Sequence, residues 1–251
     1  MSATTGETLP RVTPDTTRLE WSAFRVATGF VLAAWAITFW FLLLAGRSTL
    51  YLSTRTSWVV PVGAVLLTLA AIGRFATARE HDPTALRRRQ AWLLGLIMVP
   101  VVLILVLPPS TLTSFAAGRR GDAASAGFTA SAADISSGSL TLLDVAGAQT
   151  SKDGQRALAA RAGEQVTFLG FVTREPDTAA DEFLLTRFIV SCCVADATVA
   201  QVRVVNVQPG AWADDEWVDV SGTIYPLGRE VLVDASAVTR AQEPSPAYLS
   251  P

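Results

Sequence analysis

The stretch Arg187-Phe188-Ile189-Val190-Ser191-Cys192-Cys193-Val194-Ala195-Asp196-Ala197 holds both cysteines of the 251-residue chain, side by side. They stand at the end of an apolar run that is typical of a β-strand. Because neighbouring side chains of a strand point to opposite faces, the run predicts one buried face and one open face. The buried set is expected to be Leu184, Phe188, Val190 and Cys192, and the open set is Arg187, Ser191 and Cys193. The open set places a cation, a hydroxyl and a thiol in a row.

Strand-like runs lie on both sides of this stretch in the sequence. The five expected strands are residues 164–174, 182–193, 199–207, 216–225 and 229–239. Turn-forming residues separate them, and Gly170 and Gly222 lie inside runs, as expected of bulges in a strongly bent sheet. Five short strands predict a small OB-like β-barrel, with a half-sandwich as the alternative that periodicity does not separate.

The segments that flank the expected barrel have a different composition. Residues 110–138 are rich in Ala, Ser, Gly and Thr without apolar periodicity, which predicts a flexible tether. A short apolar segment at 140–145 and a helix near 155–161 then begin a domain that we place at residues 139–240. Residues 241–251 contain three prolines and are expected to form a disordered tail.

The N-terminal half contains three long apolar stretches. No Asp, Glu, His, Lys or Arg occurs in residues 26–46, 56–73 or 91–107, and each stretch is long enough to cross a membrane as a helix. We therefore expect a three-helix transmembrane region at residues 23–109, preceded by a disordered cytoplasmic tail at 1–22. Ion and proton pathways need ionisable groups inside the membrane, so the chain is not expected to transport a solute by itself.

Charge is divided unequally along the chain. Residues 1–120 carry twelve arginines and five acids, a net charge of +7, whereas residues 121–251 carry eight basic residues and seventeen acids, a net charge of −9. The acidic half argues against nucleic acid as a partner. Eight arginines on one side of the spans against four on the other predict a multi-pass cell-membrane protein with a cytoplasmic N-terminus and an extracytoplasmic C-terminal domain.

Three interpretations of Cys192 and Cys193 remain open: a core residue beside a groove residue, metal or thiol chemistry, and a strained disulfide. A tetrahedral zinc site needs four ligands, and neighbouring strand residues share one ion only if the turn near Asp196 twists the chain. The single histidine, His81, is expected to be a solvated loop residue. With no base, nucleophile and orienting group in one motif, we expect no enzymatic activity and no cofactor.

The chain resembles a bacterial family of YcgQ-like permease accessory subunits. The residues that carry the resemblance are Arg187-Phe188-x-x-x-Cys192-Cys193-x-Ala195-Asp196-Ala197 and Val166-Thr167-Phe168-x-Gly170-Phe171-Val172, behind three apolar spans. The resemblance implies a membrane-anchored accessory subunit whose partner is a separate polytopic YcgR-like permease. Family members often carry a His-rich run between the second and third spans, whereas this chain has Arg79-Glu80-His81-Asp82-Pro83 there.

Two functions are therefore expected from the sequence. The leading one is an accessory subunit that presents an extracytoplasmic OB-like domain to a permease or its cargo, with the lipid bilayer as its other partner. The alternative is a cell-surface thiol or metal-binding protein that uses Cys192 and Cys193. The candidate binding residues are Arg187, Ser191, Cys192, Cys193 and Asp196.

Overall fold

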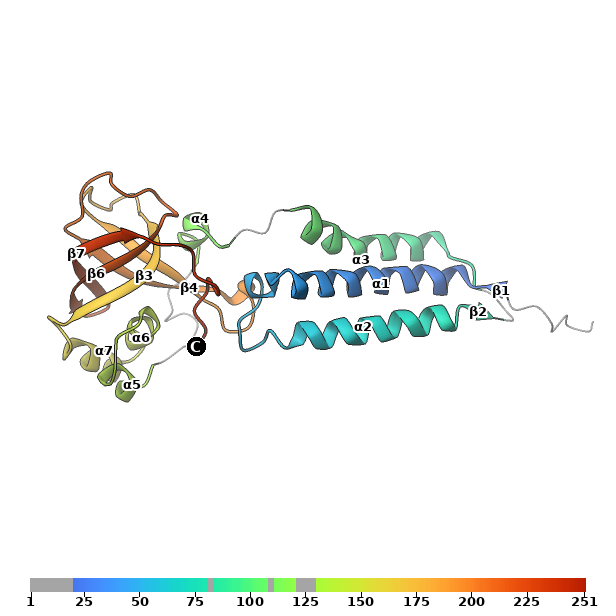
Figure 1. Cartoon of the computed structure of the whole chain (residues 1–251), viewed down its shortest axis with the longest axis horizontal. Coiled ribbons are helices and arrows are strands. Elements are labelled where there is room, and N and C mark those ends of the chain that lie inside the picture. Colours follow the sequence, from blue (N-terminus) through green and yellow to red (C-terminus); the bar gives the residue numbers. More distant parts are fainter. Residues whose placement is uncertain (1–19, 81–83, 108–110, 121–129) are drawn as a thin grey trace, which may run out of the picture. The chain divides into compact units, whose positions relative to one another are not determined.

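The computed structural model describes residues 20–80, 84–107, 111–120 and 130–251 (Figure 1). The chain divides into two compact units. A helical unit comprises Met1–Phe41 and Val62–Leu107, and a barrel unit comprises Leu42–Pro61 and Pro108–Pro251. The barrel unit is therefore assembled from two separate parts of the sequence.

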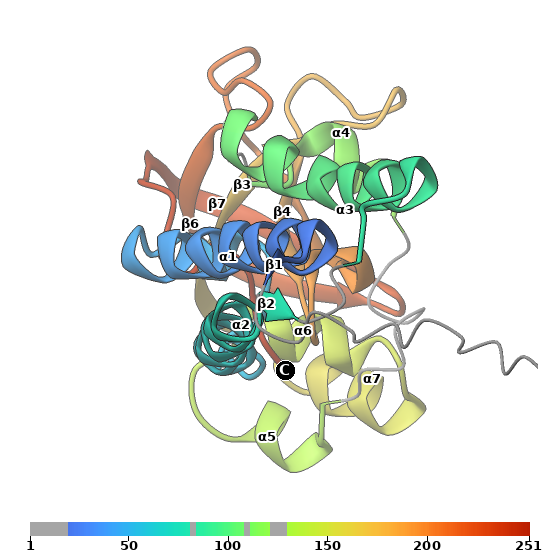
Figure 2. The same ribbon diagram turned by 90° about the vertical axis from the view of Figure 1, so that its right-hand side faces the viewer.

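The helical unit contains three long helices, α1 (Ala23–Leu44), α2 (Val59–Ala76) and α3 (Arg88–Val106). Each is long and apolar enough to cross a membrane, which confirms the prediction of three candidate spans. Large apolar side chains such as Phe30, Leu66 and Leu96 are exposed on these helices. In the two views α1 runs between α2 and α3 (Figures 1 and 2). The direction in which the helices cross the membrane stays a prediction.

Small residues and polar contacts join α1 to α2. An added Cβ at Gly29 would lie 3.0 Å from the ring of Phe75, and one at Gly63 would lie 2.7 Å from the ring of Phe39. At the start of α1, strand β1 (Glu20–Trp21) pairs with β2 (Arg79–Glu80). These contacts explain why glycine is needed at two positions where aromatic rings cross between helices.

Five strands of the barrel unit form a closed barrel in the order β3-β4-β5-β7-β6. The strands are β3 (Gln165–Thr173), β4 (Phe183–Ile189), β5 (Thr198–Val205), β6 (Trp217–Leu227) and β7 (Glu230–Arg240). Neighbours are antiparallel except for the parallel pair β5 and β7. The OB-like barrel is thus confirmed, and the half-sandwich alternative is wrong.

Gly222 marks the sharp bend that helps the sheet to close. The register of β6 against β7 shifts between Ser221 and Gly222, as expected of a bulge. An added Cβ at Gly222 would lie 2.2 Å from the carbonyl oxygen of Asp234, so no other residue fits without moving the backbone. The bulge predicted at this glycine is therefore present.

Short helices close one end of the barrel (Figure 1). They are α5 (Ala132–Ser136), α6 (Leu142–Ala148) and α7 (Lys152–Ala159). Ile135, Val145 and Leu158 are at most 1 % exposed and join the barrel core. Thr141 caps α6 in a capping box with Asp144. These apolar side chains supply the core at an end that the strands leave open.

The segment expected to be a flexible tether differs from that prediction where the structure describes it. Residues 111–120 include α4 (Ser114–Ala117), and residues 130–138 include α5. Ala117 and Ile135 are buried in two different clusters of the barrel unit. Because residues 110–138 contain few large apolar residues, the sequence did not indicate that Ala117 and Ile135 are buried. Residues 108–110 and 121–129 lie outside the described part of the chain, as do residues 1–19 and His81.

The prediction of a disordered tail at 241–251 is wrong. Ala247 and Tyr248 are buried, and Leu249 exchanges backbone hydrogen bonds with strand β4. The N–H of Leu249 donates to the carbonyl of Phe188 (2.8 Å), and its carbonyl accepts from the N–H of Val190 (2.9 Å). The reason is that β3 pairs with β4 only as far as Thr186, which leaves this edge of β4 without a partner. Residues 246–250, the tail segment, supply the missing bonds.

Candidate functional site

The two cysteines lie in a loop and not in a strand. Strand β4 ends at Ile189, and a short turn of 3-10 helix spans Val194–Asp196. Leu184, Phe188 and Val190 are buried, as predicted. Cys192 is exposed and Cys193 is partly exposed, so the placement of Cys192 in the core is wrong. Strand alternation stops where pairing with β5 stops, and the chain turns before it reaches the cysteines. We call residues 190–196 the cysteine loop.

Asp196 holds the backbone of the cysteine loop. Its carboxylate accepts hydrogen bonds from the N–H groups of Ser191 (3.1 Å), Cys192 (2.8 Å) and Cys193 (3.4 Å). Burial alone would raise the pKa of Asp196, but hydrogen bonds from the Cys192 thiol and from these N–H groups outweigh it, so the pKa is lowered. Asp196 is therefore a carboxylate at neutral pH and stabilises the turn.

The two thiols are free and lie side by side. The Sγ atoms of Cys192 and Cys193 are 3.7 Å apart. Hydrogen bonding to Asp196, followed by hydrogen bonding to Cys193, raises the pKa of the Cys192 thiol to about 11. Because the thiolate is the nucleophilic form of cysteine, Cys192 is a weak nucleophile at neutral pH in this environment.

The segment between α1 and α2 pairs with the cysteine loop. Residues 51–56, the linking loop, form an antiparallel bridge between Leu52 and Cys193. The carbonyl of Cys192 accepts hydrogen bonds from the N–H of Ser53 (3.2 Å) and from the hydroxyl of Thr56 (2.6 Å). All of these contacts lie within the barrel unit. Two regions far apart in the sequence therefore share one small sheet-like pairing.

Arg120 and the tail segment complete this junction. The guanidinium of Arg120 donates to the carbonyls of Val194 (2.8 Å) and Ala197 (3.0 Å). The hydroxyls of Ser53 and Ser250 are 3.0 Å apart. Sequence reasoning missed Arg120 and the linking loop because their bonds go to backbone atoms, which leave no residue pattern. Their only sequence signal is an arginine shortly after the third apolar stretch.

Arg187 contacts the tail segment, whereas the cysteines contact the linking loop. Its guanidinium donates to the carbonyls of Ala247 (3.1 Å) and Pro246 (3.3 Å), so it binds the tail segment. It also lies 5.9 Å from the ring centre of Trp217. Burial lowers the pKa of Arg187, which remains a cation at neutral pH. The row of Arg187, Ser191 and Cys193 expected on one open face is not formed, because the loop turns away after Val190.

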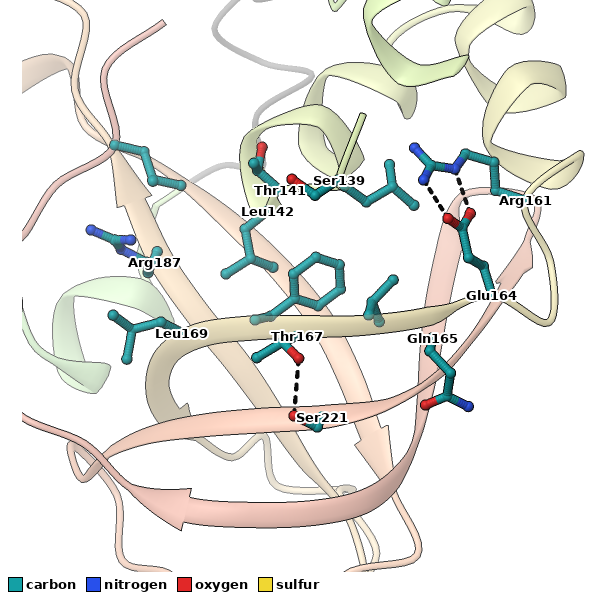
Figure 3. A pocket seen from close by; sticks show the side chains of 14 residues that line it. Ser139, Thr141, Leu142, Arg161, Glu164, Gln165, Thr167, Leu169, Arg187 and Ser221 are labelled. Carbon is teal, nitrogen blue, oxygen red and sulfur yellow. Dashed lines mark hydrogen bonds and ion pairs between the residues drawn. The ribbon is translucent and has the colours of Figure 1, made fainter. Parts of the chain in front are cut away.

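An open groove of about 620 Å³ lies between β3 and the start of α6 (Figure 3). Leu142, Leu169 and Leu249 contribute apolar surface, and Arg187 contributes to its lining. Arg161 forms a two-bond ion pair with Glu164 at the edge of the groove, at 2.5 and 2.6 Å. The charged groups of this groove are therefore already bonded within the chain.

The face that binds ligands in OB-folds is partly covered here. In that fold the second and third strands, here β4 and β5, carry the ligand face. Phe188 of β4 and Val199 of β5 lie in a buried cluster with Ala117 and Tyr248. The hydroxyl of Tyr248 accepts a hydrogen bond from the N–H of Leu112 (3.2 Å). Segments of the same chain thus occupy part of the surface on which a sugar or an oligonucleotide would bind.

These observations define a membrane protein with three apolar helices and an OB-like barrel. The linking loop and residues 111–120, which are connected to those helices in the sequence, pack within the barrel unit. Residues 136–249 match the family model of the DUF1980 C-terminal domain, an uncharacterised family. The match includes the whole barrel, the cysteine loop and most of the tail segment. No protein of curated function matches the chain.

Proposed function

We propose that the chain is the membrane-anchored accessory subunit of a two-component permease, and that its barrel unit binds a separate polytopic permease or that permease's cargo. The observation that carries the proposal is the chemistry of the three helices. Ionisable side chains occur only near their ends, at Arg25, Arg74, Arg88 and Arg89. A path for a polar solute needs polar groups within the membrane, so a second membrane protein must supply it.

The barrel unit supports an accessory role because it is attached to the helices through more than one segment. The linking loop joins it between α1 and α2, and residues 111–120 join it after α3. In this proposal the barrel acts by binding a partner and not by catalysis. Similarity to the DUF1980 C-terminal domain is compatible with this role and assigns no activity.

The bridge between Leu52 of the linking loop and Cys193 of the cysteine loop supports the proposed topology. In a chain with three spans, the α1–α2 segment and everything after α3 lie on one side of the membrane. Pairing of Leu52 with Cys193 supports that arrangement, since an uninserted α3 would leave the two residues on opposite sides. Together with the arginine bias, this supports an extracytoplasmic barrel unit.

Co-purification tests the partnership. The tagged chain, expressed at its native level and extracted in mild detergent, should bring down a polytopic membrane protein in a fixed ratio. Deletion of either gene should abolish transport of the same solute. A membrane protein with the same tag but no barrel serves as the control. Recovery of the chain alone would overturn the proposal.

Topology is tested separately with single cysteines introduced into a Cys192→Ser/Cys193→Ser background. Ser236→Cys replaces an exposed residue of β7, and Thr77→Cys replaces an exposed residue just after α2. A membrane-impermeant maleimide should label Ser236→Cys in intact cells and Thr77→Cys only after permeabilisation. The reverse pattern would place the barrel unit in the cytoplasm.

A further inference from the structure

The cysteine loop brings three metal-ligating side chains together. Among the described residues, the ligand atoms of Cys192, Cys193 and Asp196 all lie within 4.8 Å of one another. The sequence argues against such a cluster, because neighbouring residues of a regular strand point to opposite faces. The end of β4 at Ile189 and the turn at Val194–Asp196 remove that objection.

The distance between the two sulfur atoms suits a shared metal ion. Two thiolates bound to one tetrahedral ion, each at about 2.3 Å, are separated by about 3.8 Å. Cys192 Sγ and Cys193 Sγ are 3.7 Å apart. A disulfide would need a separation of about 2.0 Å, so the thiols would have to move for that bond to form. An ion can be bound with little rearrangement of either side chain.

Asp196 can offer an acceptor position to an ion. Its Oδ2 atom accepts from the N–H groups of Cys192 and Cys193, and its Oδ1 atom accepts from the N–H of Ser191. The Cys192 thiol also donates to this carboxylate, and it gives up that bond when it loses its proton, so the position becomes available to a cation. The bonds to the linking loop and to Arg120 hold the backbone in place, which reduces the ordering that binding requires.

We propose that Cys192, Cys193 and Asp196 form an open capture site for a thiophilic d¹⁰ cation, Cu(I) or Zn(II). On binding, each thiol releases its proton to solvent, a sulfur–metal bond replaces each S–H bond, and no electron is transferred. Three protein ligands leave one position open, which is typical of sites that exchange ligands and not of closed structural sites. The exposure of Cys192 gives the ion direct access from solvent.

This inference goes beyond the proposed accessory function and does not depend on it. If both hold, a metal ion is the cargo class that the barrel unit presents to its partner. Binding is measured on the purified full chain without any partner, whereas the accessory function is measured by co-purification. Failure of one experiment therefore leaves the result of the other intact.

The test is competition for Cu(I) and for Zn(II) between the reduced full chain in detergent and a coloured chelator. The wild-type chain should bind one ion of at least one of these metals. Cys192→Ser and Cys193→Ser should each lower that affinity by more than the roughly 100-fold typical of losing an outer-shell partner. X-ray absorption of the loaded chain should show two sulfur neighbours, a signature that a purely structural role of the cysteines does not produce.

Two carboxylate variants provide the matched comparison. Asp196→Asn keeps an acceptor oxygen for the loop but removes the charge of the ligand, and it should lower affinity by more than about 10-fold. Asp177→Asn makes the same charge change at an exposed loop residue and should leave affinity unchanged. Each variant is checked for the wild-type elution volume and circular dichroism. No binding of either metal by the folded wild-type chain, or equal binding by the folded Cys192→Ser/Cys193→Ser variant, would overturn the proposal.

Discussion

The cysteine loop and the tail segment are both held against the end of β4, but by different kinds of interaction. The tail segment is held through buried side chains, with Tyr248 at 5 % exposure against Phe188, in addition to the backbone bonds of Leu249. The cysteine loop is held mainly through its backbone, whose carbonyls accept from Thr56 and Arg120 and whose N–H groups donate to the Asp196 carboxylate. The buried side chains of the tail segment are therefore not accessible to a ligand. The cysteine loop is fixed by its backbone, so its two thiols stay accessible.

The largest effect is expected from Tyr248→Ala. The change removes a buried ring and leaves a cavity beside Phe188, so the free energy of unfolding should fall by about 3 kcal/mol. Guanidinium unfolding of the full chain in detergent, followed by tryptophan fluorescence, measures it. Tyr225→Ala, at a tyrosine that is 43 % exposed, should cost far less. Equal losses for the two variants would show that the tail segment is not anchored by burial.

Asp196→Ala should have the next largest effect. It removes the acceptor shared by the N–H groups of Ser191, Cys192 and Cys193, and bonds to a charged acceptor are each worth about 2 kcal/mol before solvent exposure reduces them. We expect a loss of about 2 kcal/mol in all. Hydrogen exchange should accelerate at these three amides while the amide of Leu249 stays protected. Acceleration at Leu249 as well would mean that the two segments open together.

Arg187→Met tests a side-chain polar anchor of the tail segment. Losing the bonds to the carbonyls of Pro246 and Ala247 should destabilise the tail segment by about 1 kcal/mol. Limited proteolysis should then cut after residue 245 sooner than in the wild type. Arg156→Met, at an arginine with 77 % side-chain exposure, is the control. An unchanged cleavage rate in Arg187→Met would show that Arg187 does not hold the tail segment in place.

Thr56→Val should have the smallest effect. It removes the hydroxyl that donates to the carbonyl of Cys192, and the site is exposed, so about 0.5 kcal/mol is expected. The readout is faster exchange at the amide of Val194, which bonds to Tyr51 of the linking loop. Ser57→Ala, the control, removes a hydroxyl that donates to the carbonyl of Thr54, three residues earlier in the chain. The same acceleration in that control would rule out a specific role for Thr56.

Sequence reasoning succeeded where structure follows from local periodicity. The three apolar stretches and the five strand-like runs are all present, and the bulge at Gly222 is where the glycine indicated. Each of these features is determined by the residues of one short segment. The OB-like barrel was the predicted arrangement, but periodicity did not separate it from a half-sandwich, and only the pairing of the strands shows that the barrel is closed.

The errors arose where distant segments decide the structure. Cys192 was expected in the core because the apolar run continues to it, but β4 ends at the last residue that pairs with β5. The prolines near Tyr248 indicated disorder, whereas the unpaired edge of β4 orders that segment. The linking loop and Arg120 contact the cysteine loop through backbone atoms. A contact to a backbone atom does not depend on which residue supplies that atom, so a single sequence gives no sign of which segments are in contact.

The division of the barrel unit into Leu42–Pro61 and a C-terminal part has a consequence for biosynthesis. A ribosome produces the linking loop well before it reaches Cys193, with α2 and α3 made in between. The loop must therefore wait, without its partner strand, until two more helices have entered the bilayer and the barrel has folded. Ser250, which meets Ser53, follows the last barrel strand in the sequence, so this junction is completed only after all five strands have been synthesised.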